Sequence, residues 1–128
     1  MTNAFGEAGT ADYVMLTTFR KDGSPVGTPL WAVADEGKLY MWTVTDSWKV
    51  KRLKRNPAVT VQACDARGKK LSGPVVDGTA RVLDAAGTER VRSLLKRKYK
   101  LLAWVTLLGS SLRRGKDGTV GLEITPAA

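Results

Sequence analysis

The sequence predicts a small antiparallel β-barrel that carries two helical segments. A length of 128 residues and a mass of 13.9 kDa correspond to one domain with one hydrophobic core. Short runs of β-branched and aromatic residues alternate with turn residues, which is typical of strands. Helical spacing of apolar residues replaces this alternation at two places. These observations favour six strands in a closed or partly closed barrel.

The first part of the chain predicts three strands joined by tight turns. Residues 1–12 are small and polar, and we expect them to form a flexible lead-in to a single domain over residues 13–128. Pro29 has no backbone N–H and therefore indicates an edge or an interrupted ladder in the second strand. The strands are predicted at 13–19, 26–33 and 39–45, with turns at 21–24 and 35–38.

A short basic helix is predicted next, followed by three more strands and a second helix. Asp46 or Ser47 is a suitable N-cap for the first helix, which ends before Pro57. Apolar residues recur at helical spacing again from Thr88, and residues 101–112 continue this helix or form another. The remaining strands are predicted at 58–64, through 78–83 and at 119–124.

The composition limits the possible chemistry. Lys and Arg number 21 and Asp and Glu 12, so the net charge of +9 favours a polyanionic partner, whether nucleic acid, an anionic membrane surface or an acidic small molecule. The chain has no histidine, which excludes histidine-dependent catalytic triads, proton relays and metal sites. Its single cysteine, Cys64, excludes internal disulfides and cysteine-rich zinc sites, so we expect no bound metal.

The start of the chain lacks the basic and apolar regions of a signal peptide. The longest apolar run, residues 101–108, is far shorter than the roughly 20 residues that cross a bilayer. We therefore expect a cytoplasmic location.

The strongest local signal is the basic segment that forms the first helix. Five of the seven residues 49–55 are basic, although cations in the first turn of a helix oppose the helix dipole. A phosphate held by first-turn N–H groups, the Ser47 hydroxyl and the Lys49 ammonium would account for them. A solvated basic face, with Val50 and Leu53 turned inward, accounts for them equally well.

Aromatic residues on the second and third strands form another candidate site. Trp31, Tyr40 and Trp42 could hold a planar heterocycle, or they could belong to the barrel core. The basic cluster at 96–100 is interpreted as the solvated face of the second helix rather than as a nucleic-acid site. No nucleophile motif is present, and Cys64 is interpreted as a small buried hydrophobe. A bound cofactor would therefore carry out any catalysis.

The segments RKDGSPV, TPLW and LKRNPAVTV together resemble the pyridoxamine 5'-phosphate oxidase-like superfamily of split β-barrel flavoproteins. Within it, the sequence is similar to small actinobacterial coenzyme F-420-dependent reductases, strongly over residues 13–83 and in general layout beyond them. The resemblance implies a homodimer of mainly β, six-stranded split barrels. It also implies two cofactor sites at the subunit interface, which take FMN or the deazaflavin F-420.

Carried over position by position, the resemblance implies three groups of cofactor contacts. The second strand would flank the tricyclic ring, the third strand would contact the ring or the ribityl chain, and the following turn would bind the phosphate. The implied residues are Thr28, Pro29 and Trp31 for the first group, Trp42 and Thr43 for the second, and Ser47, Lys49 and Lys51 for the third.

One departure from the family pattern bears on the cofactor. Flavin-binding members commonly have Arg before the lysine aligned with Lys49, where this chain has Trp48. The difference favours F-420, whose phosphodiester and oligoglutamate tail suit the remaining positive charge. Tail partners are expected at Lys54, Arg55, Lys69 and Lys70.

The resemblance predicts a reductase that transfers a hydride from C5 of reduced F-420 to an electron-poor small molecule. Its catalytic residues are not assigned. A protein that carries F-420, FMN or haem without catalysis is an alternative reading. A nucleic-acid-binding barrel is a less favoured one, and a membrane-surface role is disfavoured because the basic helix lacks a broad apolar face.

Overall fold

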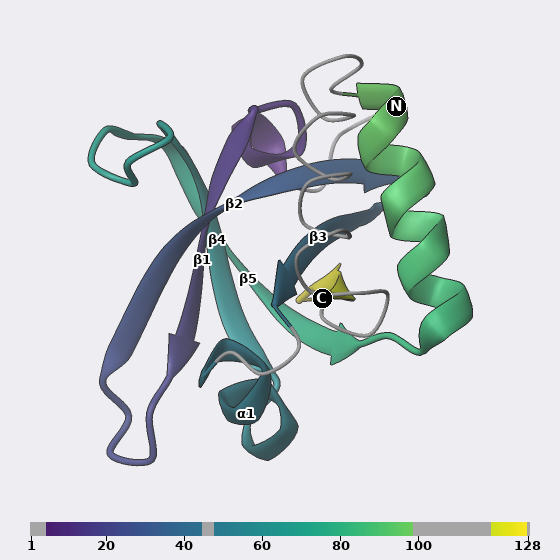
Figure 1. Cartoon of the computed structure of the whole chain (residues 1–128). Helices are drawn as coiled ribbons and strands as arrows, with labels where there is room; N and C mark the ends of the chain where they lie inside the picture. The colour runs from purple at the N-terminus through teal and green to yellow at the C-terminus, as the bar shows by residue number, and fades with distance from the viewer. Residues whose placement is uncertain (1–4, 45–47, 99–118, 128) are drawn as a thin grey trace.

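Six antiparallel strands close into a barrel in the order β1-β2-β3-β6-β5-β4 (Figure 1). The structure is a computed structural model that describes residues 5–44, 48–98 and 119–127. The predicted fold class is confirmed. The strands are β1 (Tyr13–Phe19), β2 (Pro25–Asp35), β3 (Lys38–Val44), β4 (Ala58–Cys64), β5 (Leu71–Val82) and β6 (Thr119–Pro126).

The alternation of side chains along each strand divides the barrel into an inside and an outside. Val14, Leu16 and Thr18 of β1 are fully buried and point inward, whereas the residues between them are half-buried on the outer surface. The same alternation puts Leu39 and Met41 of β3 inside the core, and Tyr40 and Trp42 outside it. The register of the strands therefore decides which predicted site residues share a surface.

Helix α1 (Trp48–Arg55) closes the lower end of the barrel in Figure 1. Val50 and Leu53 are 2% and 4% exposed, and they are the apolar residues of the segment 50–55, whose other residues are all basic. The helix ends at Arg55, before Asn56-Pro57, as predicted. Its basic side chains are thereby turned away from the core.

A second helix, residues 85–98, lies against the outer surface of the barrel (Figure 1). Val91 and Leu95 are fully buried there and pack with Tyr40 in a cluster separate from the barrel core. Trp31 and Trp42 pack against the same cluster. The interpretation of these aromatic residues as barrel core is therefore wrong, since their strands turn them toward the helix.

Several observed elements have other bounds than predicted; β2, for example, spans Pro25–Asp35 rather than 26–33. β5 begins at Leu71, well before the predicted 78–83, because its first residues pair with the end of β4 across an irregularity between Val61 and Ala63. The second helix begins at 85 rather than 88, and β6 extends to Pro126. The predictions for residue 45 and for residues 101–112 lie outside the described residues.

The expected lead-in contributes to the domain from residue 5 onward. A 3-10 turn, η1 (Gly6–Gly9), packs against β4 and β5, and Phe5 and Ala8 are 1% and 0% exposed. These two side chains belong to the barrel core. The packed domain therefore begins before residue 13.

Candidate cofactor-binding surface

The outer face of β2 and β3 presents the tryptophans that the sequence singled out. Ala32 pairs with Met41 in the β2–β3 ladder, and this register places Trp31 and Trp42 on the same outer face of adjacent strands. The ring of Trp31 also meets Tyr13 of β1 edge-on, with 6.4 Å between ring centroids. Both tryptophans are half-buried, so this face offers a partly covered aromatic surface.

Arg92 of the second helix lies over Trp42. Its guanidinium carbon is 5.3 Å from the centre of the indole ring, and its Nη1 donates to Glu89 at 3.1 Å. The Arg92 side chain is only 16% exposed. Sequence reasoning missed this residue, because the contact joins positions 50 residues apart.

The structure separates the other predicted contacts on β2 and β3. Pro29 lies on the outer face, whereas Thr28 and Thr43 point toward the inside, as their pairing with Leu16 and Val120 requires. Thr43 is buried at 7% exposure near the end of β3. The predicted set is therefore not brought onto one surface.

The predicted phosphate-binding residues lie at the β3–α1 junction. Ser47 lies outside the described residues, and Lys49 is described only as a backbone position in the first turn of α1. Lys51 is exposed on α1, and this helix has no acidic residue in its first turn. The first turn of α1 therefore has no carboxylate of its own that would repel an anion.

The β1–β2 hairpin extends the positive surface of α1. Arg55 of α1 donates from Nη2 to the carbonyl of Phe19 at 3.3 Å, which joins the helix to the hairpin. The hairpin carboxylate, Asp22, accepts hydrogen bonds from the N–H and the hydroxyl of Ser24, and these bonds lower its pKa. We call this surface the basic end; it comprises Arg20, Lys21, Lys51, Arg52, Lys54 and Arg55.

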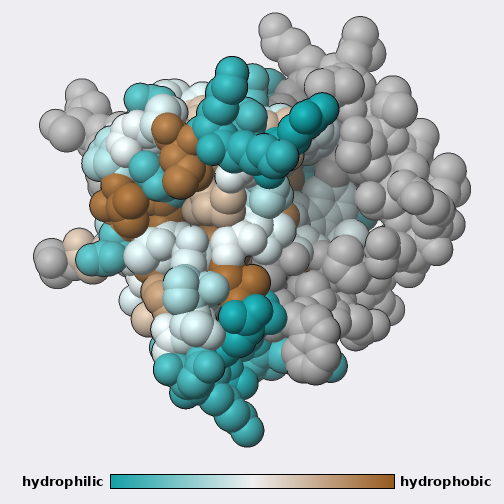
Figure 2. All heavy atoms as spheres, turned by 90° about the vertical axis from the view of Figure 1, so that its left-hand side faces the viewer, coloured by the Kyte–Doolittle hydropathy of each residue, from teal (hydrophilic) through white to brown (hydrophobic). Residues whose placement is uncertain are grey.

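Lys69 and Lys70, also expected to contact an acidic tail, lie at the other end of the barrel. β4 runs from α1 to the loop 65–70, and its seven residues span about 20 Å. Figure 2 shows hydrophilic side chains gathered at the top and the bottom of one face of the molecule, with apolar patches between them. Within one subunit, Lys69 and Lys70 therefore do not share a site with Lys54.

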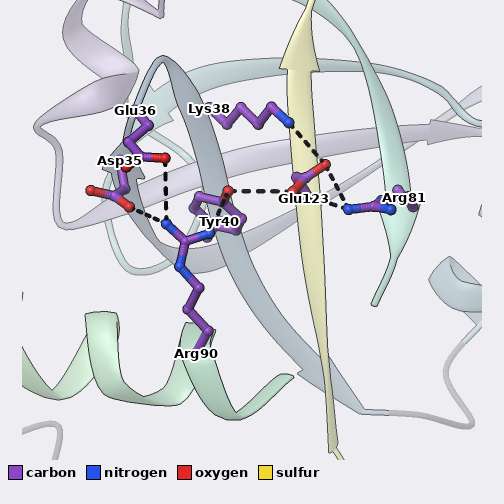
Figure 3. Close-up of polar contacts among 7 residues, drawn as sticks. All are labelled: Asp35, Glu36, Lys38, Tyr40, Arg81, Arg90 and Glu123. Atoms are coloured by element: carbon purple, nitrogen blue, oxygen red, sulfur yellow. Dashed lines mark hydrogen bonds and ion pairs between the residues drawn. The ribbon is translucent and has the colours of Figure 1, made fainter. Parts of the chain in front are cut away.

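An ion cluster on the outer surface of β3, β6 and β5 was not predicted (Figure 3). Glu123 of β6 is 8% exposed and accepts from the Tyr40 hydroxyl at 3.3 Å. Lys38 and Arg81 approach the same carboxylate at 3.5 and 3.2 Å. Arg90 then links Tyr40 to Asp35. The sequence signal that could have indicated this cluster is Glu123, which is the charged residue of β6.

Lys98 fastens the end of the described helix to the barrel near Trp31. Its Nζ donates to the carbonyls of Ala11 and Ala32, each at 2.6 Å. Burial lowers the pKa of Lys98, while Asp12 acts in the opposite direction. The basic cluster that contains it is therefore not wholly a solvated face, since this one ammonium bonds to two main-chain carbonyls.

The remaining candidate features do not indicate a nucleophile, a metal site or a membrane-spanning helix among the described residues. Cys64 is half-buried, and burial followed by the charge of Asp65 raises its pKa, which makes the thiol a poor nucleophile. Within residues 5–44, 48–98 and 119–127, no group of three or more side chains could hold a metal ion. No helix in these ranges has the length and apolar character needed to cross a membrane.

Comparisons with known proteins agree with this architecture. The family model described as pyridoxamine 5'-phosphate oxidase matches residues 6–128. A conserved hypothetical protein from Mycobacterium tuberculosis has a TM-score of 0.70 at 21% identity, covering 94% of this chain and 76% of that one. No curated protein gives a significant match.

Two further solved structures indicate the range of functions on this fold. A structure named F420 reductase has a TM-score of 0.62 at 19% identity, covering 100% of this chain and 97% of that one. The haem storage protein HutZ from Vibrio cholerae has a TM-score of 0.59 at 12% identity, covering 98% and 86%. At these identities the likeness concerns the fold alone.

Proposed function

The chain belongs to the pyridoxamine 5'-phosphate oxidase family over residues 6–128, and from this premise we propose that it is an F-420-dependent reductase. The acceptor is an electron-poor small molecule. FMN is the alternative cofactor, since it shares the phosphate and the planar ring. The fold likeness to a structure named F420 reductase is consistent with this assignment.

The observation that carries the proposal is the position of α1. The helix follows β3 directly, seals the barrel with Val50 and Leu53, and presents a basic surface that has no acid in its first turn. A cofactor whose anionic group binds there extends along β3 toward Trp42. This arrangement fits a cofactor with a phosphate at one end and a planar ring at the other.

The residues of the chain would bind and orient the cofactor. Ser47, Lys49 and Lys51 hold the phosphate, Trp42 contacts the ribityl chain or the ring, and Pro29 and Trp31 flank the ring. Thr28 and Thr43, which face the barrel interior, are left out of this set. When bound, reduced F-420 supplies a hydride from C5 to the acceptor. Correct orientation of two reactants can lower a barrier by up to about 7–11 kcal/mol.

A proton must accompany the hydride, and the chain has no histidine to provide it. Tyr13 and Lys98 both lie beside Trp31, the former through its ring and the latter through its bond to Ala32. We propose water or one of these side chains as the proton donor.

Two further features complete the proposal. The active form is a homodimer with a cofactor site at each side of the subunit interface, and the protein acts in the cytoplasm. The acidic tail of F-420 lies along the basic end, where Arg20 and Lys21 join Lys54 and Arg55. Lys69 and Lys70 are too far along β4 to contact the same tail from the same subunit.

The test is a fluorescence titration of cofactor-free protein with F-420 and, in parallel, FMN. The protein is produced in a host that does not make F-420. Tight binding of F-420 and weak binding of FMN are expected. Lys49→Ala should weaken F-420 binding by about 1.5–3 kcal/mol, because a charge-assisted contact is lost. Lys69→Ala, at the other end of the barrel, is the matched control and should bind as the wild type does.

Each outcome bears on a different part of the proposal. Tighter binding of FMN than of F-420 would support the proposed site but would identify FMN as the cofactor. An unchanged affinity of Lys49→Ala would remove the phosphate assignment. Tight F-420 binding without turnover of quinones, enones or tetrapyrroles would favour a carrier over a reductase.

A further inference from the structure

Two polar side-chain atoms on the outside of β3 and β6 are buried and have no hydrogen-bond partner among the described residues. They are the indole Nε1 of Trp42 and the hydroxyl Oγ1 of Thr119. Thr119 is 9% exposed and is the first residue of β6. Since a buried polar group without a partner destabilises the folded state, two such groups on one face require an explanation.

The β3–β6 register brings these groups to the same strip of surface. Trp42 lies opposite Gly121, and Thr119 is two residues from Gly121 on the same strand. Diagonal neighbours of this kind are about 7–8 Å apart and within reach of an aromatic side chain. Val91 of the second helix packs directly over Gly121, so the strip follows the border between the helix and the sheet.

The chemistry of the strip favours an oxygen-bearing ligand. An indole N–H can only donate a hydrogen bond, while a threonine hydroxyl can donate and accept. The guanidinium of Arg92, stacked on the Trp42 ring, adds donors on the same side. Such a set is complementary to the hydroxyl groups of a sugar alcohol or to the carbonyl groups of a heterocycle.

We propose that Trp42 and Thr119 bind an oxygen atom of the cofactor, on its ribityl chain or its ring. This inference rests on the proposed function, which places Trp42 against that part of the cofactor. Both atoms are shielded from solvent, so the incoming oxygen displaces the groups that cover them. Binding is therefore coupled to a local rearrangement of this face.

The experiment removes each polar atom and measures two quantities. Thr119→Val keeps the shape of the side chain and should raise the melting temperature of cofactor-free protein, because it removes an unsatisfied buried group. Trp42→Phe also removes ring volume that packs against the second helix, so only its affinity is diagnostic. The same two variants should bind F-420 or FMN about fivefold more weakly, the equivalent of one lost hydrogen bond. Fluorescence titration and thermal unfolding are the measurements.

Thr18→Val is the matched control. The Thr18 hydroxyl is also buried with no partner in the described ranges, but it points into the barrel core, away from the strip. Its removal should raise the melting temperature as well, and the affinity for both cofactors should stay at the wild-type value. This control distinguishes two effects: the stability gained by removing an unsatisfied group, and the affinity lost by removing a contact with the ligand.

The outcomes distinguish this inference from the proposed function. If wild-type protein binds neither F-420 nor FMN, the proposed function fails and this inference fails with it. If wild-type protein binds but Thr119→Val binds equally well, only this inference fails. A lower melting temperature of Thr119→Val would also overturn it, because the hydroxyl would then have a partner within the protein.

Titration with a cofactor ring that lacks the ribityl chain shows which part of the cofactor Thr119 contacts. The probes are lumiflavin for FMN and 8-hydroxy-5-deazaflavin for F-420. A loss of affinity in Thr119→Val for the complete cofactor alone would assign the contact to a chain hydroxyl. An equal loss for the bare ring would assign it to a ring carbonyl. Both results support a ligand oxygen at this position.

Discussion

Single residues on the outer surface of the barrel decide how its strands are held together, and Glu123 is the clearest example. Its carboxylate lies between Lys38 of β3 and Arg81 of β5, and it also accepts from Tyr40. Burial raises the pKa of Glu123, but the hydrogen bond and charge of Arg81, followed by Lys38, outweigh this effect and lower it. The ionised carboxylate therefore stabilises the contact between three strands.

The pH dependence of stability should show this contribution. Because the folded pKa lies below the ordinary value of 4.5, the stabilisation is complete above that pH and is lost as the pH falls through the folded pKa. Glu123→Gln should lower the free energy of unfolding by about 1–2 kcal/mol at pH 7, since its cationic partners are partly exposed. It should also flatten the acid side of the profile.

Urea denaturation between about pH 3 and pH 8 measures both effects. Asp77→Asn, which removes an exposed carboxylate from β5, is the control and should leave the stability at pH 7 nearly unchanged. Equal acid slopes for the wild type and Glu123→Gln would contradict the role given to this carboxylate.

Among the elements, the second helix depends on a glycine in the strand beneath it. A Cβ atom at Gly121 would lie 2.8 Å from Cγ2 and 3.2 Å from Cβ of Val91, too close without a shift of the helix. Gly121→Ala should therefore destabilise the protein by about 1–3 kcal/mol.

Chemical denaturation of a double-mutant cycle tests this contact. Val91→Ala leaves space above residue 121, so adding it to Gly121→Ala should cost less than the sum of the two single changes. If the changes in the free energy of unfolding were strictly additive, the packing of the helix would not depend on this glycine.

Elements with an uninterrupted local pattern can be predicted from the sequence, whereas elements that depend on long-range pairing cannot. β4 was predicted with its observed bounds, because apolar and polar residues alternate along it without interruption. The start of β5 was missed because Ser72-Gly73-Pro74 is typical of a loop, and these residues form a strand through pairing with β4. Long-range pairing overrode the local preference there.

The site was predictable to the same extent. The hairpin pattern was sufficient to place Trp31 and Trp42 on neighbouring strands, and their register follows from the turn between them. It did not indicate that Thr28 and Thr43 face the interior. Arg92 contacts Trp42, and Thr119 lies on the strand paired with it, only through tertiary structure that no local spacing encodes.

At the scale of the whole molecule, the net charge of +9 is divided between separate surfaces. The basic end and the loop 65–70 lie at opposite ends of β4 (Figures 1 and 2). In the loop, Asp65 accepts from the backbone N–H groups of Arg67, Lys69 and Lys70, which lowers its pKa and fixes the turn. Within the part of the chain that the structure describes, a polyanion therefore meets the basic end and the loop 65–70 as separate surfaces, and the basic end is the one that adjoins α1.

Paired charge reversals determine which surface takes the acidic tail. Lys21→Glu with Lys54→Glu alters the basic end, and Lys69→Glu with Lys70→Glu makes the same change of net charge in the loop. We expect the first pair to weaken F-420 binding about tenfold at low salt and FMN binding much less, because FMN has no tail. The second pair should change neither affinity. Fluorescence titration at low and high salt measures this.

The pattern of losses separates three explanations of the positive charge. A loss confined to F-420 and to the basic end, diminishing at high salt, supports a local contact with the tail. Equal losses from both pairs would indicate attraction by the overall field and would contradict the tail assignment. A single-stranded oligonucleotide that binds more tightly than F-420, with steep salt dependence and sensitivity to both pairs, would favour the nucleic-acid-binding barrel, because only a long polyanion can engage both ends of β4 at once.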